Sequence, residues 1–210
     1  MTGVQTCALP IFAIGSLTNL GRALRLEPEL PLWLRGVTLM GGTVYAEHFP
    51  WPPMLETNLN CDPEATRLVF ESGLPLTIVP MEVTTQVFLT AEQRATMAGW
   101  DAPLPSALVT MMEGMLSGMD SLSAEVGLSE DFYQGRTFMH DPLAVAASFG
   151  SPLLTVEPLH VRYEVIEQVV RTMPYPDLEG NVRVATAVDA PAFVQFWLER
   201  VEAISAAPAH

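Results

Sequence analysis

The stretch Phe138–Ala146, which reads FMHDPLAVA, places an imidazole directly beside a carboxylate. Asp141 is a favoured N-cap residue and Pro142 suits a first helical turn, so the stretch predicts a buried helix with His140 and Asp141 at its mouth. An imidazole can transfer a proton near neutral pH, and a carboxylate can bind a cation or hydroxyl groups. The simpler alternative is that Asp141 only caps the helix.

Two further groups of polar residues follow predicted strands. Thr18 and Asn19 come after the apolar residues 12–15, while Glu56 and Asn58 lie in the proline-rich loop after the second strand. In open α/β sheets ligands bind beyond the carboxyl ends of the strands. Carboxylates, amides and an imidazole there would suit a neutral, hydroxyl-rich ligand such as a sugar, and an oxocarbenium-like transition state. The alternatives are helix capping, a solvated carboxylate and an amide that only holds the loop backbone.

Short apolar strands alternate with helical patterns along the chain. Strands are expected at residues 12–15, 37–40, 76–80, 153–156 and 182–185, with extended chain continuing to 165. Helices are expected at residues 20–26, 63–72, 91–99, 106–122, 142–146 and 193–204. This alternation predicts an α/β fold with an open, mostly parallel sheet and flanking helices.

The segment 106–122 carries a methionine stripe at helical spacing, and such a stripe is typical of an adaptable core rather than of a cofactor site. Its members are Met111, Met112, Met115 and Met119.

The composition is that of a globular chain, with 49% hydrophobic and 16% charged residues among 210. A formal net charge of −14 argues against nucleic acid and against an anionic membrane surface. Cys7 and Cys61 form no disulfide framework or metal motif, which fits a reducing cytosol, so a cytoplasmic location is expected. The sequence has no apolar run of about 18 residues and no dinucleotide, phosphate-loop or nucleophile-elbow motif.

The two ends of the chain differ from its body. Residues 1–11, MTGVQTCALPI, resemble the translation of a sequencing-library adapter, and residues 205–210 are expected to fray. Residues 12–204 contain no repeat and no linker. We therefore expect them to form the C-terminal portion of a single domain.

Four blocks in order resemble the inosine-uridine-preferring nucleoside hydrolase family over nearly all of residues 12–204. GSLTNLGRALRLEPEL resembles the family's G-P-L-T-N-L stretch, and VTLMGG with ETNLNCDPEA resembles its M-G-G and E-F-N-I-x-A-D-P-E-A-A blocks. FMHDPLAVA resembles the H-D-P-L-A-V-A block, and NVRVATAVDAPAFVQFWLERV the closing strand and helix. The resemblance implies a Rossmann-like core and hydrolysis of the N-glycosidic bond of ribonucleosides, giving ribose and a free base with a bound calcium ion.

The resemblance also implies a role for each polar residue. The backbone carbonyl of Thr18 and the carboxylate of Asp141 would bind calcium, and Asp141 would hold a ribose hydroxyl as well. His140 would face the base as a candidate proton donor. A nucleoside would be the substrate, and the full-length protein would form a homodimer or homotetramer. The remaining ribose contacts would be Met40, Glu56 and Asn58.

The sequence departs from the family pattern in the loop before Glu56, in residues 160–180 and at the N-terminus. The loop before Glu56 is about two residues longer than in the family, so that Pro50 or His48 stands where the family has an asparagine. Residues 160–180 also differ, which would alter the base pocket or the subunit contacts.

The family's N-terminal D-x-D-x-G-x-D-D segment, which supplies most calcium ligands and the water-activating aspartate, has no match. We therefore expect an N-terminally truncated nucleoside hydrolase that is inactive by itself. The alternative is a non-catalytic sugar- or nucleoside-binding module, or an inactive orphan fragment.

Overall fold

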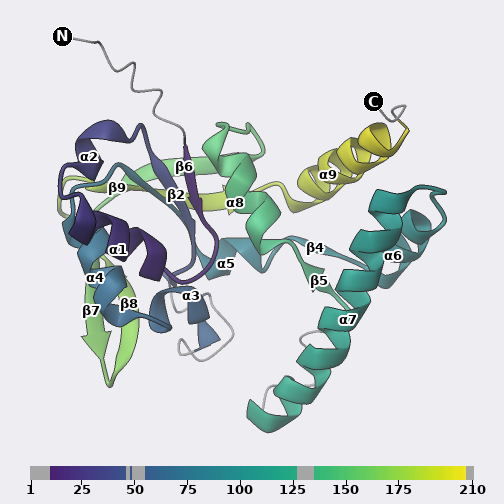
Figure 1. Ribbon diagram of the computed structural model, residues 1–210, viewed down its shortest axis with the longest axis horizontal. Helices are drawn as coiled ribbons and strands as arrows, with labels where there is room; N and C mark the ends of the chain where they lie inside the picture. Colours follow the sequence, from purple (N-terminus) through teal and green to yellow (C-terminus); the bar gives the residue numbers. More distant parts are fainter. Residues whose placement is uncertain (1–9, 46–47, 49–54, 127–134, 207–210) are drawn as a thin grey trace. The chain divides into compact units, whose positions relative to one another are not determined.

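The computed structural model describes residues 10–45, 48, 55–126 and 135–206 (Figure 1). The chain forms two compact units, and each of them is built from two segments. Unit 1 comprises Met1–Thr84 and His140–Val188, and unit 2 comprises Thr85–Met139 and Asp189–His210. Because the chain leaves unit 1 and returns to it, no single linker separates the two units.

Unit 1 is organised around a five-stranded sheet in the order β1-β2-β3-β9-β6. Four strands run parallel, namely β1 (Ile11–Ala13), β2 (Val37–Met40), β3 (Leu76–Val79) and β9 (Val182–Val188). The edge strand β6 (Leu154–Leu159) is antiparallel to β9. The predicted α/β fold with a mostly parallel sheet is therefore confirmed.

Helices cover both faces of this sheet (Figure 1). On one face α1 (Thr18–Leu26) packs against α4 (Pro63–Glu71), and on the other face α8 (His140–Ser148) contacts β2 and β3. Alternate strand residues point to opposite faces, so one set reaches the core beneath α1 and α4. Members of that core include Leu20, Leu24, Val37, Leu39, Val69, Leu76, Ile78, Val182 and Val184.

Unit 1 also contains short elements that the sequence patterns did not predict. They are α2 (Leu30–Trp33), α3 (Thr57–Asn60), α5 (Met81–Thr84) and a hairpin of β7 (Val161–Ile166) with β8 (Val169–Pro174). The hairpin turns at Glu167 and Gln168, whose φ angles are 52° and 66°. Such two-residue turns usually carry Asn-Gly or Gly, so this one gave no sequence signal.

Unit 2 is mainly helical. It contains α6 (Ala91–Ala98), α7 (Pro103–Val126) and α9 (Ala190–Ser205), with β4 (Phe88–Leu89) antiparallel to β5 (Thr137–Phe138). A capping box of Thr90 and Gln93 begins α6, and the side chain of Asp189 caps α9. No helix within the described ranges combines the length and apolar character needed to cross a membrane.

The methionine stripe does not form a core. Met111 and Met115 are 71% and 46% exposed, so the prediction was wrong for both. The buried face of α7 instead carries Pro105 and Leu116, which are about three helical turns apart. Met111 lies about 140° around the helix from Leu116 and therefore points away from that face.

α1 and α4 are in such close contact that adding one methyl group at Gly21 should destabilise the chain. A Cβ atom on Gly21 would lie 2.8 Å from Ala65 Cβ and 2.9 Å from its Cα. Gly21→Ala should lower the free energy of unfolding by about 1–3 kcal/mol in a urea titration, because the helices must move apart. The control is Gly114→Ala, because an added Cβ atom there would have no described packing neighbour within 4 Å. The higher helix propensity of alanine should raise the free energy of unfolding of this control by up to ~1 kcal/mol. Wild-type stability in Gly21→Ala would contradict the packing.

Candidate active site

The carboxyl end of β2 is shaped by two glycines with positive φ angles. Gly41 has a φ of 144° and Gly42 a φ of 83°. The Gly41 N–H donates to Val79 O, and the Met81 N–H donates to Gly42 O, so the ends of β2 and β3 stay joined. A Cβ atom on Gly41 would lie 2.8 Å from Glu56 Oε1. Only glycine therefore lets the Glu56 carboxylate approach the end of β2.

Glu56 is a buried carboxylate and not a solvated surface group. Its side chain is 3% exposed and accepts hydrogen bonds from the backbone N–H groups of Asn58 and Leu59, each at 3.0 Å. Glu56 is thereby the N-cap of α3. Burial raises the pKa of this carboxyl from 4.5 to about 7, although the backbone hydrogen bonds act in the opposite direction.

Asn58 joins Glu56 to Met40. The Asn58 Nδ2 donates to the backbone carbonyl of Met40 at 3.0 Å and approaches Met40 Sδ at 3.3 Å. Met40 itself is only 4% exposed. The sequence analysis selected Met40, Glu56 and Asn58 as neighbours, and the structure brings all three together at the end of β2.

His140 contacts a residue that the sequence analysis missed. Its Nδ1 lies 2.7 Å from the hydroxyl of Thr84, and that hydroxyl also lies 3.3 Å from Met81 O. Burial lowers the pKa of His140 to about 4, so the ring is neutral at neutral pH. Thr84 is fully buried and ends α5, directly after β3. A polar residue just past a strand end was the signal that could have identified it.

Asp141 lies inside the first turn of α8 and is not its N-cap, because the helix already begins at His140. The prediction that Asp141 caps this helix was therefore wrong. The side chain is partly buried, and this burial raises the pKa of its carboxyl. Within the part of the chain that the structure describes, the carboxylate makes no hydrogen bond or ion pair. It is thus available for a ligand.

Thr18 connects two helices. The N-cap of α1 is Leu17, and no side chain caps that end, so Thr18 and Asn19 do not act as caps. The Thr18 hydroxyl instead donates to Asp62 Oδ2 at 2.7 Å, and Asp62 Oδ1 accepts from the Ala65 N–H at the start of α4. The Thr18 side chain therefore helps to hold α1 against α4. Metal binding by its backbone carbonyl stays a prediction.

Comparison of this chain with known protein families identifies the family to which it belongs. Residues 4–195 match the family model described as inosine-uridine preferring nucleoside hydrolase. The chain belongs to this family. The resemblance inferred from the four sequence blocks is therefore confirmed.

Named relatives agree with this nucleoside hydrolase assignment. The chain is 30% identical over 201 residues to the non-specific ribonucleoside hydrolase RihC of Shigella boydii and of Escherichia coli, which covers 93% of this chain. It spans about 60% of the length of these curated relatives. It superposes on a purine-preferring ribonucleoside hydrolase from Gardnerella vaginalis with a TM-score of 0.76 at 25% identity, covering 94% of this chain and 61% of that one. A plant nucleoside hydrolase shares the fold, with a TM-score of 0.75, 22% identity and coverage of 92% and 62%.

The metal that the nucleoside hydrolase resemblance implies is not accommodated by these residues alone. Calcium takes about six to eight oxygen ligands. Across the described ranges, no group of three or more His, Cys, Asp or Glu side chains could hold a metal ion. The Thr18 carbonyl and Asp141 would provide only part of such a set. Of the two candidates for the family's loop asparagine, His48 is exposed and Pro50 lies outside the described residues.

The raised pKa of Glu56 predicts a pH-dependent stability. Between its ordinary value of 4.5 and about 7, this carboxyl is protonated in the folded chain but ionised in the unfolded chain. The free energy of unfolding should therefore fall as pH rises through this window, by roughly 3 kcal/mol in total. Glu56→Gln, which keeps a carbonyl acceptor, should remove that fall in urea titrations at several pH values. The exposed control Glu29→Gln should keep it, and an equal fall in wild type and Glu56→Gln would contradict the burial.

Proposed function

We propose that this chain forms the ribose-facing and base-facing part of a hydrolase that cleaves the N-glycosidic bond of ribonucleosides, giving ribose and a free base. The observation that carries the proposal is the cluster of Glu56, Asn58 and Met40 at the carboxyl end of β2. This is the edge of an open α/β sheet where ligands bind. Membership of the nucleoside hydrolase family supports the reaction type.

The proposed ribose contacts have suitable chemistry. Glu56 can accept hydrogen bonds from sugar hydroxyls, and Asn58 can both donate and accept them. A carboxylate held in a site of low polarity also stabilises the positive charge that develops on the sugar ring when a glycosidic bond breaks. Asp141 would hold a further hydroxyl, and Met40 would provide an apolar wall.

The proposed position of His140 is beside the base. A residue that protonates a leaving group must hold its proton near the working pH. The pKa of about 4 shows that His140 holds no second proton at neutral pH in the environment described. Its role as proton donor therefore requires bound substrate to raise this pKa. With the pKa unchanged, the neutral ring can only exchange hydrogen bonds with the bound base.

The family generally uses a metal ion, and calcium is the ion that we propose. Asp141 and the Thr18 carbonyl are the proposed ligands from this chain. The other ligands would come from outside the described residues. A homodimeric or homotetrameric state and a cytoplasmic location are parts of the same proposal, and light scattering and cell fractionation test them.

Nucleoside binding tests the ribose contacts directly. Inosine and uridine should bind the 210-residue chain in a calorimetric titration, and Asn58→Ala should weaken binding about tenfold because it removes an amide from the cluster. The matched control is Gln195→Ala, which changes an exposed amide in α9 and should bind like wild type. Equal weakening by both variants, or no binding of either nucleoside, would overturn the placement of the sugar.

Turnover separates the hydrolase from a second candidate, a non-catalytic sugar- or nucleoside-binding module. The chain alone should release no base from inosine or uridine, with or without calcium. An in-frame acidic motif in the upstream reading frame would support the hydrolase. In such a longer protein, Asp141→Ala should reduce turnover at least about 100-fold with the fold retained, whereas the exposed Asp101→Ala should have no effect. Near wild-type turnover in Asp141→Ala would refute its assigned role.

A further inference from the structure

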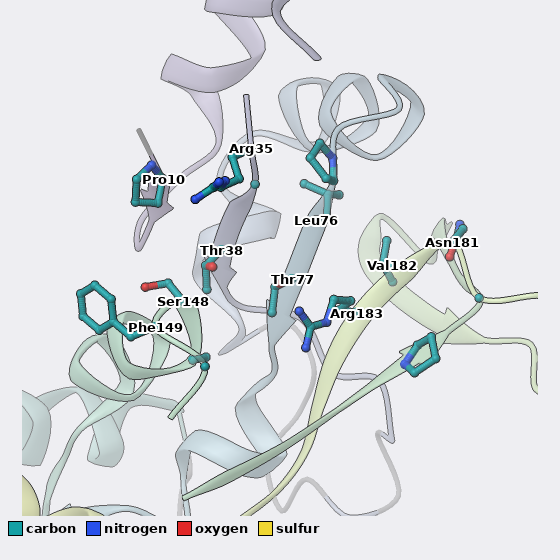
Figure 2. A pocket seen from close by; sticks show the side chains of 16 residues that line it. Pro10, Arg35, Thr38, Leu76, Thr77, Ser148, Phe149, Asn181, Val182 and Arg183 are labelled. Atoms are coloured by element: carbon teal, nitrogen blue, oxygen red, sulfur yellow. The ribbon is translucent and has the colours of Figure 1, made fainter. Parts of the chain in front are cut away.

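Unit 1 has a cavity of about 580 Å³ at the amino ends of its parallel strands (Figure 2). Gly36, Leu76 and Val182, at or next to the first residues of β2, β3 and β9, all line it. The candidate active site lies at the opposite ends of the same strands, about 13 Å away for a strand of four residues. None of the candidate active-site residues lines the cavity. It is therefore a separate feature.

The strand register places a polar row across the cavity wall. Thr38 of β2 is aligned with Thr77 of β3, and Thr77 is aligned with Arg183 of β9. Aligned residues share a face, and the alternate positions belong to the core on the other side of the sheet. A parallel sheet covered by helices is normally apolar on both faces. Neither threonine hydroxyl makes a hydrogen bond with any residue in the described ranges, so both are available to a ligand.

The cavity is cationic although the chain is acidic. Arg35 and Arg183 both line it, and no Asp or Glu does, in a chain with 24 acidic and ten basic residues. Figure 2 shows both guanidinium groups at the wall. Among the described residues neither Arg35 nor Arg183 has an ion-pair partner. Glu157 is aligned with Val184, so it lies on the opposite face of the sheet from Arg183.

The C-terminal turn of α8 also lines the cavity, and a helix C-terminus normally repels anions. Here the exposed carbonyls are largely occupied. Phe149 N–H and Ser151 N–H donate to Ala146 O, and Gly150 N–H donates to Ala147 O. At this turn the cavity is therefore lined mainly by the Phe149 ring, and few carbonyl groups are left there to repel an anion.

We propose that this cavity binds a small phosphate-bearing molecule, whose phosphate lies between Arg35 and Arg183. The planar guanidinium fork matches phosphate oxygens, and two such groups compensate the charge of the phosphate. Arg183 is level with Thr38, two strand spacings or ~10 Å away, and Arg35 precedes Thr38 by three residues, so the two arginine Cα atoms lie ~14 Å apart, a separation that two long side chains with a phosphate between them can span. The rest of the molecule contacts Thr38, Thr77 and the Phe149 ring, and the cavity volume is typical of small-molecule sites. The proposal is independent of the proposed hydrolase function.

Calorimetric titration of the full chain with inorganic phosphate and with ribose 5-phosphate tests this site. Both should bind saturably at millimolar concentration or below, and ribose 5-phosphate should bind at least as tightly because it also reaches the threonine row. Arg35→Gln and Arg183→Gln should each weaken both ligands about tenfold, since each removes a charge-assisted contact. Thr77→Val should weaken ribose 5-phosphate more than inorganic phosphate.

The matched control is Arg22→Gln, which makes the same charge change on the exposed surface of α1. Unchanged binding in Arg22→Gln supports a local site, whereas equal weakening in Arg22→Gln and Arg183→Gln would show only a general charge effect and overturn the proposal. Absence of saturable binding by either ligand, or binding of inorganic phosphate without ribose 5-phosphate, would overturn it as well.

Discussion

Glu56 buries a carboxyl group beside the two glycines that end β2, and the arrangement around the candidate active site depends on it. Its oxygens accept the N–H groups of Asn58 and Leu59, and this contact requires the missing side chain of Gly41. Burial without an ion pair is costly, as the raised pKa of Glu56 records. Proteins retain such groups mostly at functional sites, where the cost is offset by binding or chemistry.

Hydrogen bonds from the neighbours of Glu56 join elements that are distant in sequence. α3 begins after Glu56, and Asn60 in that helix donates to the backbone carbonyl of Glu56 while its Oδ1 accepts from the Val170 N–H of β8. Gly42 lies against Thr172 of the same strand, whose hydroxyl accepts from the Thr43 N–H at 2.9 Å. The end of β2, the helix α3 and the β7–β8 hairpin are thus joined by side-chain-to-backbone hydrogen bonds in the segments that flank Glu56.

The elements that the sequence predicted correctly are those determined by residues close together in the chain. The apolar strand β2 follows from four adjacent residues and is confirmed, and the helices expected at residues 91–99 and 193–204 correspond to α6 and α9, which begin after the caps Thr90 and Asp189. The β7–β8 hairpin and the exposed face of α7 were missed or mispredicted because tertiary packing decides them. For the site, the family motif selected Glu56, Asn58 and Met40, but no local pattern showed that Glu56 is buried or that Thr84 contacts His140.

We propose that the buried Glu56 carboxyl contacts the sugar. Carbon-13 NMR titration of this side-chain carboxyl, with and without saturating ribose, measures that contact. The midpoint should be about 7 for the free chain and lower with ribose, because sugar hydroxyls stabilise the ionised form. A midpoint near the ordinary value of 4.5, or a midpoint that ribose leaves unchanged, would contradict the proposed role of Glu56.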